Sequence, residues 1–244
     1  MKLKKRAFLV LCCVGFLVSV AAAGLRPPSS GPTAAEPGAA VQDKYVYADF
    51  ETVKDNRPVS NGGGLIQLTA YQEVATMPSK FKGQEGSNPP APELVHLKQG
   101  DPNRAIAFSY QMLSGNQWAG VGVEIHAQAD KDGKAVAIDM SHYKFMTFQM
   151  YATGAQTGRV DFVSRDNGVG LSKDFPSVPF KINPTGLNTY QIPLNSMSQP
   201  SWADVRVSSK DILKKLTAIN IYIYCAQCTP MQGTVVIDNV IFQN

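Results

Sequence analysis

The sequence has 244 residues, and its 23 lysine and arginine residues against 19 aspartate and glutamate residues give a formal net charge of +4. Four of the basic residues lie in the first six positions, so the chain after position 23 has equal numbers of acidic and basic residues. A balanced chain lacks the basic surface that general nucleic-acid binding requires, and we expect no nucleic-acid partner.

Residues 1–23 have the pattern of a signal peptide. A basic start at 2–6 precedes an apolar stretch at 7–20, and Ala21 to Ala23 provide the small residues that a signal peptidase requires before Gly24. The alternative is an uncleaved membrane anchor, for which the apolar stretch is barely long enough. We expect cleavage, a secreted or periplasmic location, and no membrane span after cleavage.

Residues 24–42 are rich in proline, glycine and alanine, and we expect a disordered linker there. Residues 43–244 then form a single domain, long enough to bury a substantial core. Short runs of β-branched and aromatic residues, bounded by Gly, Pro, Asn or Asp, predict strands along it. The predicted strands are 45–50, 65–71, 93–97, 106–112, 120–127, 144–151, 159–164, 189–194, 216–224 and 234–242.

Helical periodicity is nearly absent from this domain. One short helix is predicted at 209–215, with Ser208 or Ser209 as its N-cap before Asp211. About ten strands in a domain of this length predict an all-β fold, a two-sheet antiparallel β-sandwich.

Acidic residues occur in both the first and the last predicted strand. Asp49 and Glu51 lie near the start of the domain, and Asp238 lies among apolar residues near its end. A buried carboxylate needs a cation or a set of donors, so two such strands lying side by side would suit a hard cation such as calcium. The alternative is an edge strand with Asp238 turned to solvent.

Alternation in the strands shows which side chains leave the core. It turns Arg159, Asp161, Tyr222 and Tyr224 outward, and it does the same for Gln149 and Tyr151. Tyrosine rings stack on the apolar faces of sugars, and planar polar groups bond to sugar hydroxyls, so this composition suits a carbohydrate. An ordinary solvated sheet face has the same composition, and the pattern alone does not separate the two.

Cys225 and Cys228 are the two cysteines left after signal cleavage. No helix is predicted next to them, as a thioredoxin-type site would need. We expect a small disulfide that clamps a hairpin before the last strand, with redox chemistry or free thiols as alternatives.

Six segments occur in an order that resembles the galactose-binding-like jelly roll: 49–51, 118–123, 143–148, 190–194, 216–219 and 237–242. The resemblance is strongest to family-eleven carbohydrate-binding modules, and extends to the complex I intermediate-associated domain. It implies a jelly roll of two antiparallel sheets, a structural calcium near the termini and a concave face that binds β-glucan.

Carried onto this sequence, the resemblance makes Glu51 and Asp238 the main calcium ligands, with Asp49 a weaker candidate. It places Tyr151, Arg159, Asp161, Tyr222 and Tyr224 on the binding face. Gln149 stands where an aromatic residue is common in the family.

We therefore expect a non-catalytic protein that binds a polysaccharide of the β-glucan kind. A protein-interaction or envelope-assembly module, with an envelope protein as its partner, is the alternative on the same fold. A glycoside hydrolase is a further alternative, for which Glu124 and Asp161 are the candidate pair of carboxylates.

Overall fold

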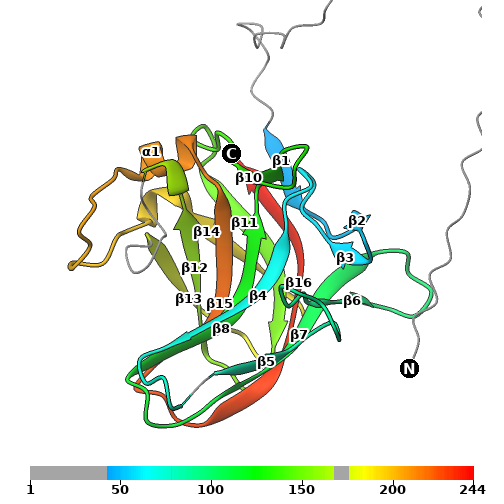
Figure 1. Ribbon diagram of the computed structural model, residues 1–244, viewed down its shortest axis with the longest axis vertical. Coiled ribbons are helices and arrows are strands. Elements are labelled where there is room, and N and C mark those ends of the chain that lie inside the picture. Colours follow the sequence, from blue (N-terminus) through cyan, green and yellow to red (C-terminus); the bar gives the residue numbers. More distant parts are fainter. Residues whose placement is uncertain (1–42, 78, 168–175) are drawn as a thin grey trace, which may run out of the picture. The chain divides into compact units, whose positions relative to one another are not determined.

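A computed structural model describes residues 43–77, 79–167 and 176–244 (Figure 1). The predicted signal peptide at 1–23 and linker at 24–42 lie outside the described residues. Nearly all regular structure in the described part is β, and its named strands pair antiparallel.

The larger of the two main sheets has seven strands. Its central strand is β16 (Met231–Gln243), which pairs with β11 (Phe145–Ala152), with β7 (Arg104–Met112) and with β1 (Lys44–Ala48). The remaining strands lie outside these: β14 (Asn188–Pro193) on β11, and β5 (Lys80–Lys82) and β6 (Glu93–His96) on β7.

The second sheet has five strands in the order β13-β12-β15-β8-β4. Their bounds are Ser177–Lys181, Thr157–Val163, Ala218–Ala226, Trp118–His126 and Ile66–Gln72, respectively. Two small hairpins accompany the sheets: β2 (Val53–Lys54) with β3 (Arg57–Pro58), and β9 (Gln128–Ala129) with β10 (Ala135–Val136). The helical segments are η1 (Arg165–Asn167), η2 (Leu194–Ser196) and α1 (Ser209–Lys214).

The two sheets are the layers of a sandwich, with one core between them (Figure 1). Met146, Phe148 and Met150 of β11 contribute to it from one sheet, and Ile219 and Ile223 of β15 contribute from the other; each is at most 1% exposed. The residues between them on each strand face outward, as alternation predicts. The all-β two-sheet fold predicted from the sequence is therefore confirmed.

All ten predicted strands are present with shifted ends, and α1 has Ser208 as its N-cap, whose hydroxyl accepts from the Asp211 amide. Strand β13 is missing from the sequence prediction because Pro176 directly precedes it and Pro179 lies within it. It is an edge strand, and an edge strand accepts proline because the amides on one side of it need no partner in the sheet.

The first and last strands of the domain lie side by side. Tyr45 is opposite Phe242 and Val46 is opposite Ile241. From the same strand β1, the buried hydroxyl of Tyr47 donates to the carbonyl of Ile125 in the other sheet over 2.9 Å. One strand thus connects the start of the domain both to its end and to the opposite layer.

Cys225 and Cys228 form a disulfide, as predicted. The prediction that it clamps a hairpin is wrong, because β15 and β16 belong to different sheets. The disulfide instead closes the turn through which the chain crosses from the five-stranded sheet to the seven-stranded one. Sequence reasoning missed this because two consecutive strands pair more often than they separate.

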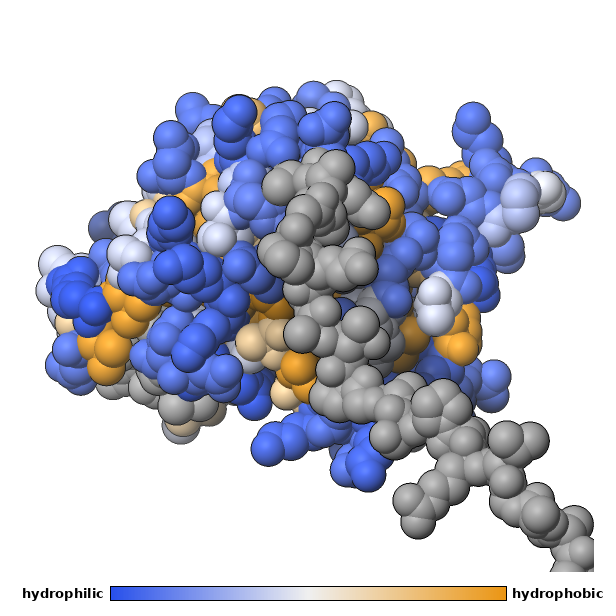
Figure 2. Space-filling view, turned by 90° about the horizontal axis from the view of Figure 1, so that it is seen from above, coloured by the Kyte–Doolittle hydropathy of each residue, from blue (hydrophilic) through white to orange (hydrophobic). Residues whose placement is uncertain are grey.

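The surface seen from above is mostly hydrophilic, and its hydrophobic residues appear in small separate patches (Figure 2). Within the described part of the chain, no helix has the length and apolar character that crossing a bilayer requires.

Candidate functional site

Four of the six predicted ligand residues share the outer face of the five-stranded sheet. The strand register places Arg159 of β12 beside Tyr222 of β15, and Asp161 beside Asn220. Tyr224 follows Tyr222 by two positions and so lies on the same side of β15.

The next two strands complete this surface. On β8, Gly122 lies opposite Tyr222 and Gly120 lies opposite Tyr224. On β4, Thr69 lies opposite Gly122 and Tyr71 lies opposite Gly120. We call this surface the tyrosine face; it comprises Thr69, Tyr71, Trp118, Arg159, Asp161, Asn220, Tyr222 and Tyr224.

An ion pair between two residues of β12 forms part of the tyrosine face. Arg159 Nη2 donates to Asp161 Oδ2 over 2.9 Å, and Arg159 Nε lies 2.7 Å from Asp161 Oδ1 without the alignment of a hydrogen bond. The Asp161 side chain is 1% exposed, whereas that of Arg159 is 23% exposed. Burial raises the pKa of Asp161 to about 6, and the neighbouring Arg159 opposes the rise.

The guanidinium of Arg159 lies between two tyrosine rings. Its Cζ is 5.2 Å from the ring centre of Tyr71 and 5.0 Å from that of Tyr224, both distances typical of cation–π contacts. Tyr71 also meets Tyr222 edge-on at 5.0 Å and lies 5.9 Å from Trp118. The rings therefore form a continuous aromatic surface that ends at Trp118, which is 41% exposed.

Three buried oxygens of the tyrosine face have no hydrogen-bond partner within the described residues: Tyr71 Oη, Asp161 Oδ1 and Asn220 Oδ1. Buried polar atoms in folded proteins nearly always have one. Burial raises the pKa of Tyr71, so its phenol stays protonated and can donate. Because these atoms are buried, a ligand could reach them only if a covering side chain moved aside.

Gln149 and Tyr151 do not belong to this surface, which corrects the prediction of a single face. Both lie on β11 in the seven-stranded sheet, where Gln149 is opposite Asp238 and Tyr151 is opposite Val236. Alternation shows whether a side chain points into the core or away from it. A sandwich has two outer faces, however, and the sequence pattern does not show which of the two faces a given strand belongs to.

The binding face expected from the resemblance is not open at Tyr222. Tyr222 is only 6% exposed, because Tyr71 packs against its ring and Thr69 Oγ1 lies 2.8 Å from its hydroxyl. Tyr71 and Trp118 were absent from the predicted site. The alternation of β4 turns Tyr71 outward together with Gln67 and Thr69, but the pairing of β4 with β8 is not visible in the sequence.

The three predicted metal ligands lie near one another at the paired chain ends. Asp238 is 0% exposed and accepts from Asn103 Nδ2 over 2.9 Å and from the Asn239 amide over 2.8 Å. Burial raises its pKa, Asn103 and Asn239 lower it, and the charges of Glu51 and Asp49 raise it further. The carboxylates thus share one region of negative potential.

Each of these carboxylates already has a protein donor. The Arg104 amide donates to Glu51 Oε1 over 2.6 Å, and Asn61 Nδ2 donates to Asp49 Oδ2 over 2.9 Å. Among the described residues, no three His, Cys, Asp or Glu side chains are grouped closely enough to hold a metal. The donor chemistry suits calcium, and an ion bound here would have to replace protein donors that these carboxylates already have.

The two carboxylates considered for glycoside hydrolysis, Glu124 and Asp161, already contact other side chains. Asn220 separates Glu124 from Asp161 across the sheet. Glu124 contacts His126 Nε2 at 2.5 Å and accepts from Arg165 Nη2 over 3.2 Å, while Asp161 pairs with Arg159. Both carboxylates are therefore paired with basic side chains, Glu124 with Arg165 and Asp161 with Arg159.

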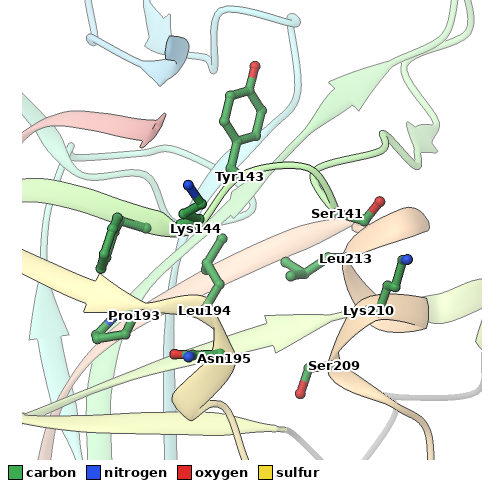
Figure 3. Close-up of a pocket in the computed structure, with 10 residues that line it drawn as sticks. Ser141, Tyr143, Lys144, Pro193, Leu194, Asn195, Ser209, Lys210 and Leu213 are labelled. Carbon is green, nitrogen blue, oxygen red and sulfur yellow. The ribbon is translucent and has the colours of Figure 1, made fainter. Parts of the chain in front are cut away.

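A separate cavity of about 580 Å³ lies between α1 and the adjoining ends of β11 and β14 (Figure 3). Leu194 and Leu213 give it an apolar wall, and Lys144 and Lys210 lie at its border. Its described lining includes none of the predicted ligand residues.

Comparison with solved structures supports the predicted fold. The chain resembles the family 11 carbohydrate-binding module of the cellulosomal cellulase Lic26A-Cel5E of Clostridium thermocellum, with a TM-score of 0.51 and 16% identity over 84% of this chain and 95% of that one. The fold is that of a carbohydrate-binding-module jelly roll. No protein-family model and no curated protein matches the sequence.

Two further modules of Clostridium thermocellum are similar at lower scores. A family 11 module in complex with a β-1,3-1,4-mixed-linked tetrasaccharide has a TM-score of 0.49 and 14% identity, over 82% of this chain and 94% of that one. A family 30 module of the cellulase Cel9D-Cel44B has a TM-score of 0.45 and 8% identity, over 72% of this chain and 91% of that one.

Proposed function

We propose that this chain is a non-catalytic, secreted or periplasmic protein that binds a β-glucan-like polysaccharide on its tyrosine face. The observation that carries the proposal is the convergence of the rings of Tyr71, Trp118 and Tyr224 on one sheet face, which also carries Asp161 and Asn220. The rings come from three different strands and supply stacking area. The location rests on the signal-peptide pattern of residues 1–23.

Trp118 is the contact that a ligand reaches most easily. It is 41% exposed and lies 5.9 Å from the Tyr71 ring, so a pyranose ring stacking on it contacts one end of the aromatic surface. Tyr71 Oη and Asn220 Oδ1 are buried without partners in the described structure, so they can bond sugar hydroxyls only where the side chains that cover them move aside. A polysaccharide crosses the strands in this arrangement.

Affinity electrophoresis through gels containing a mixed-linkage β-glucan tests the proposal. Trp118→Ala is expected to lower retention about tenfold, because one stacking contact is lost. Trp202→Ala is the matched control, since Trp202 is 68% exposed but lies on the loop between η2 and α1 and not on the sheet. Tyr151→Ala on the opposite outer face is a second control.

Both controls are expected to keep the retention of the wild type. Equal retention of the Trp118 variant and the wild type would remove the tyrosine face from the proposal. If the wild type shows no retention with any glycan on an array, the protein-interaction alternative replaces this proposal.

Calcium binding at Glu51 and Asp238, with Asp49 beside them, is also proposed. The negative potential around Asp238 supports it. An ion there would have to displace the contact between Arg104 and Glu51, and the Arg104 side chain is 29% exposed and has access to solvent. Such an ion would tie together strands β1 and β16 without taking part in sugar binding.

A further inference from the structure

The side chain of Arg159 fills the space that a sugar would need on the tyrosine face. Tyr224 and Tyr71 lie on either side of Gly120, which has no side chain to separate them. The Arg159 guanidinium lies between these two rings, about 5 Å from each centre. A face of each ring is therefore already in contact with a group of the protein itself.

We propose that Arg159 is a built-in competitor for the sugar: its guanidinium occupies the subsite between Tyr71 and Tyr224, and a sugar ring binds there only when Arg159 swings out. The inference rests on the proposed function and identifies the residue that limits access to the site. It makes Arg159 a determinant of affinity and of which part of the face a ligand reaches first.

The contacts of Arg159 allow it to leave. Its side chain is the exposed member of the ion pair, and Asp161 lies beneath it at 1% exposure. One aligned hydrogen bond, from Nη2 to Asp161 Oδ2, joins the two side chains, while Nε has no aligned partner among the described residues. A long, flexible side chain with this geometry reaches water without moving the strand.

The polar atoms around the guanidinium suit the group that would replace it. Tyr71 Oη is buried and unpartnered in the described structure, and Asp161 Oδ1 lacks an aligned donor. Departure of Arg159 opens a subsite with two ring faces and leaves a phenol donor and a carboxylate acceptor beside it. A pyranose has the apolar faces and hydroxyls that such a subsite binds.

Asp161 determines how strongly the Arg159 side chain is held between Tyr71 and Tyr224. The charged and titratable groups that face it are Arg159 on its own strand, Tyr222 and Tyr224 on β15, Glu124 on β8 and Tyr71 on β4. Strand β13 places Ser177 and Pro179 beside the pair, and neither titrates. Protonation of Asp161 removes the opposite charge from Arg159, so the subsite opens more readily at pH 5 than at pH 7.5.

The test compares retention on the mixed-linkage β-glucan gel for four proteins: the wild type, Asp161→Asn, Arg159→Ala and the double variant with both changes. Arg159→Ala alone leaves a buried carboxylate without its cation and is expected to fold poorly. The double variant avoids that charge, and thermal melting checks that it is folded. We expect it to be retained about tenfold more strongly than the wild type, because the cation–π contacts of Arg159 no longer compete with the sugar.

The pH series provides a second readout. Wild-type retention is expected to rise severalfold from pH 7.5 to pH 5, and the double variant is expected to show no such rise. If the wild type binds the β-glucan and the folded double variant binds it no more strongly, Arg159 is not a competitor. The proposed function is unaffected by that result. If neither protein binds any β-glucan, the proposed function fails, and the competitor role fails with it.

Discussion

The ring of Tyr71 lies directly over Gly120, at the point where any other residue would place its Cβ. A Cβ built on Gly120 would be 2.5 Å from Tyr71 Cζ and 2.6 Å from its hydroxyl oxygen. These separations are well below van der Waals contact, so the missing side chain is what lets the end of the Tyr71 ring lie against β8. The aromatic surface of the tyrosine face depends on this glycine.

Gly120→Ala is therefore expected to turn the Tyr71 ring away from the sheet. The ring is the end of a side chain that can rotate, so we expect a stability loss of about 1 kcal/mol. Retention on the β-glucan gel should fall about as far as in Tyr71→Ala. A Gly120→Ala variant that keeps full retention would show that the position of Tyr71 does not matter for binding.

The neighbouring glycine gives a contrasting case. A Cβ on Gly122 would lie 2.1 Å from the carbonyl oxygen of Ile221, which is backbone and cannot turn aside. We expect Gly122→Ala to cost about 3 kcal/mol and to lower the thermal midpoint strongly. Thermal melts of the two variants separate the effect on the ring from the effect on the sheet.

The buried carboxyl of Asp161 predicts how stability depends on pH. Its pKa is about 6 in the folded protein and 3.8 as the ordinary value, so between these values the folded state holds a proton that the unfolded state has released. The unfolding free energy therefore falls as pH rises from 4 to 6, by roughly 3 kcal/mol for a shift of this size. Above pH 6 this contribution stays constant.

Urea unfolding at a series of pH values measures this slope. Asp161→Asn is expected to flatten it between pH 4 and pH 6, and Asp132→Asn, which removes an exposed carboxylate, is expected to leave it unchanged. A steep slope that persists in the Asp161→Asn variant would mean that another group is responsible.

Much of the fold could be predicted because its signals are local. Alternation along β11, β12 and β15 gave the correct inward and outward residues, and turn residues marked the ends of ten strands. The partner of each strand is not a local property. Gln149 and Arg159 both leave the core, yet they face opposite sides of the sandwich, because β11 and β12 belong to different sheets.

The candidate site was predicted in part for the same reason. Arg159, Asp161, Tyr222 and Tyr224 come from two adjacent strands, so their common face followed from alternation once these strands were paired. Tyr71 and Trp118 join them only through β8 and β4, and the close approach of Tyr71 depends on Gly120. Contacts of this kind depend on register between distant segments, which the pattern of one segment does not contain.

The disulfide at the crossing between the sheets is expected to make a modest contribution to stability. It closes a ring of only four residues, for which loss of chain entropy in the unfolded state accounts for about 2 kcal/mol. The variant with both Cys225→Ser and Cys228→Ser should melt at a lower temperature but keep its glycan retention. Loss of retention in a folded double-serine protein would show that the turn also shapes the tyrosine face.

If calcium binds where the first and last strands of the domain meet, removing it should lower the stability of the protein without changing its binding of sugar. If an ion binds only the folded state, a hundredfold excess over its Kd adds about 2.7 kcal/mol to the unfolding free energy. We expect the thermal midpoint to fall after chelation and to recover when calcium, but not magnesium, is restored. Glu51→Gln is expected to abolish this response while leaving retention on the β-glucan gel intact, because the tyrosine face belongs to the other sheet. A midpoint that does not respond to chelation would mean that Arg104, Asn103 and Asn61 satisfy the three carboxylates without a metal.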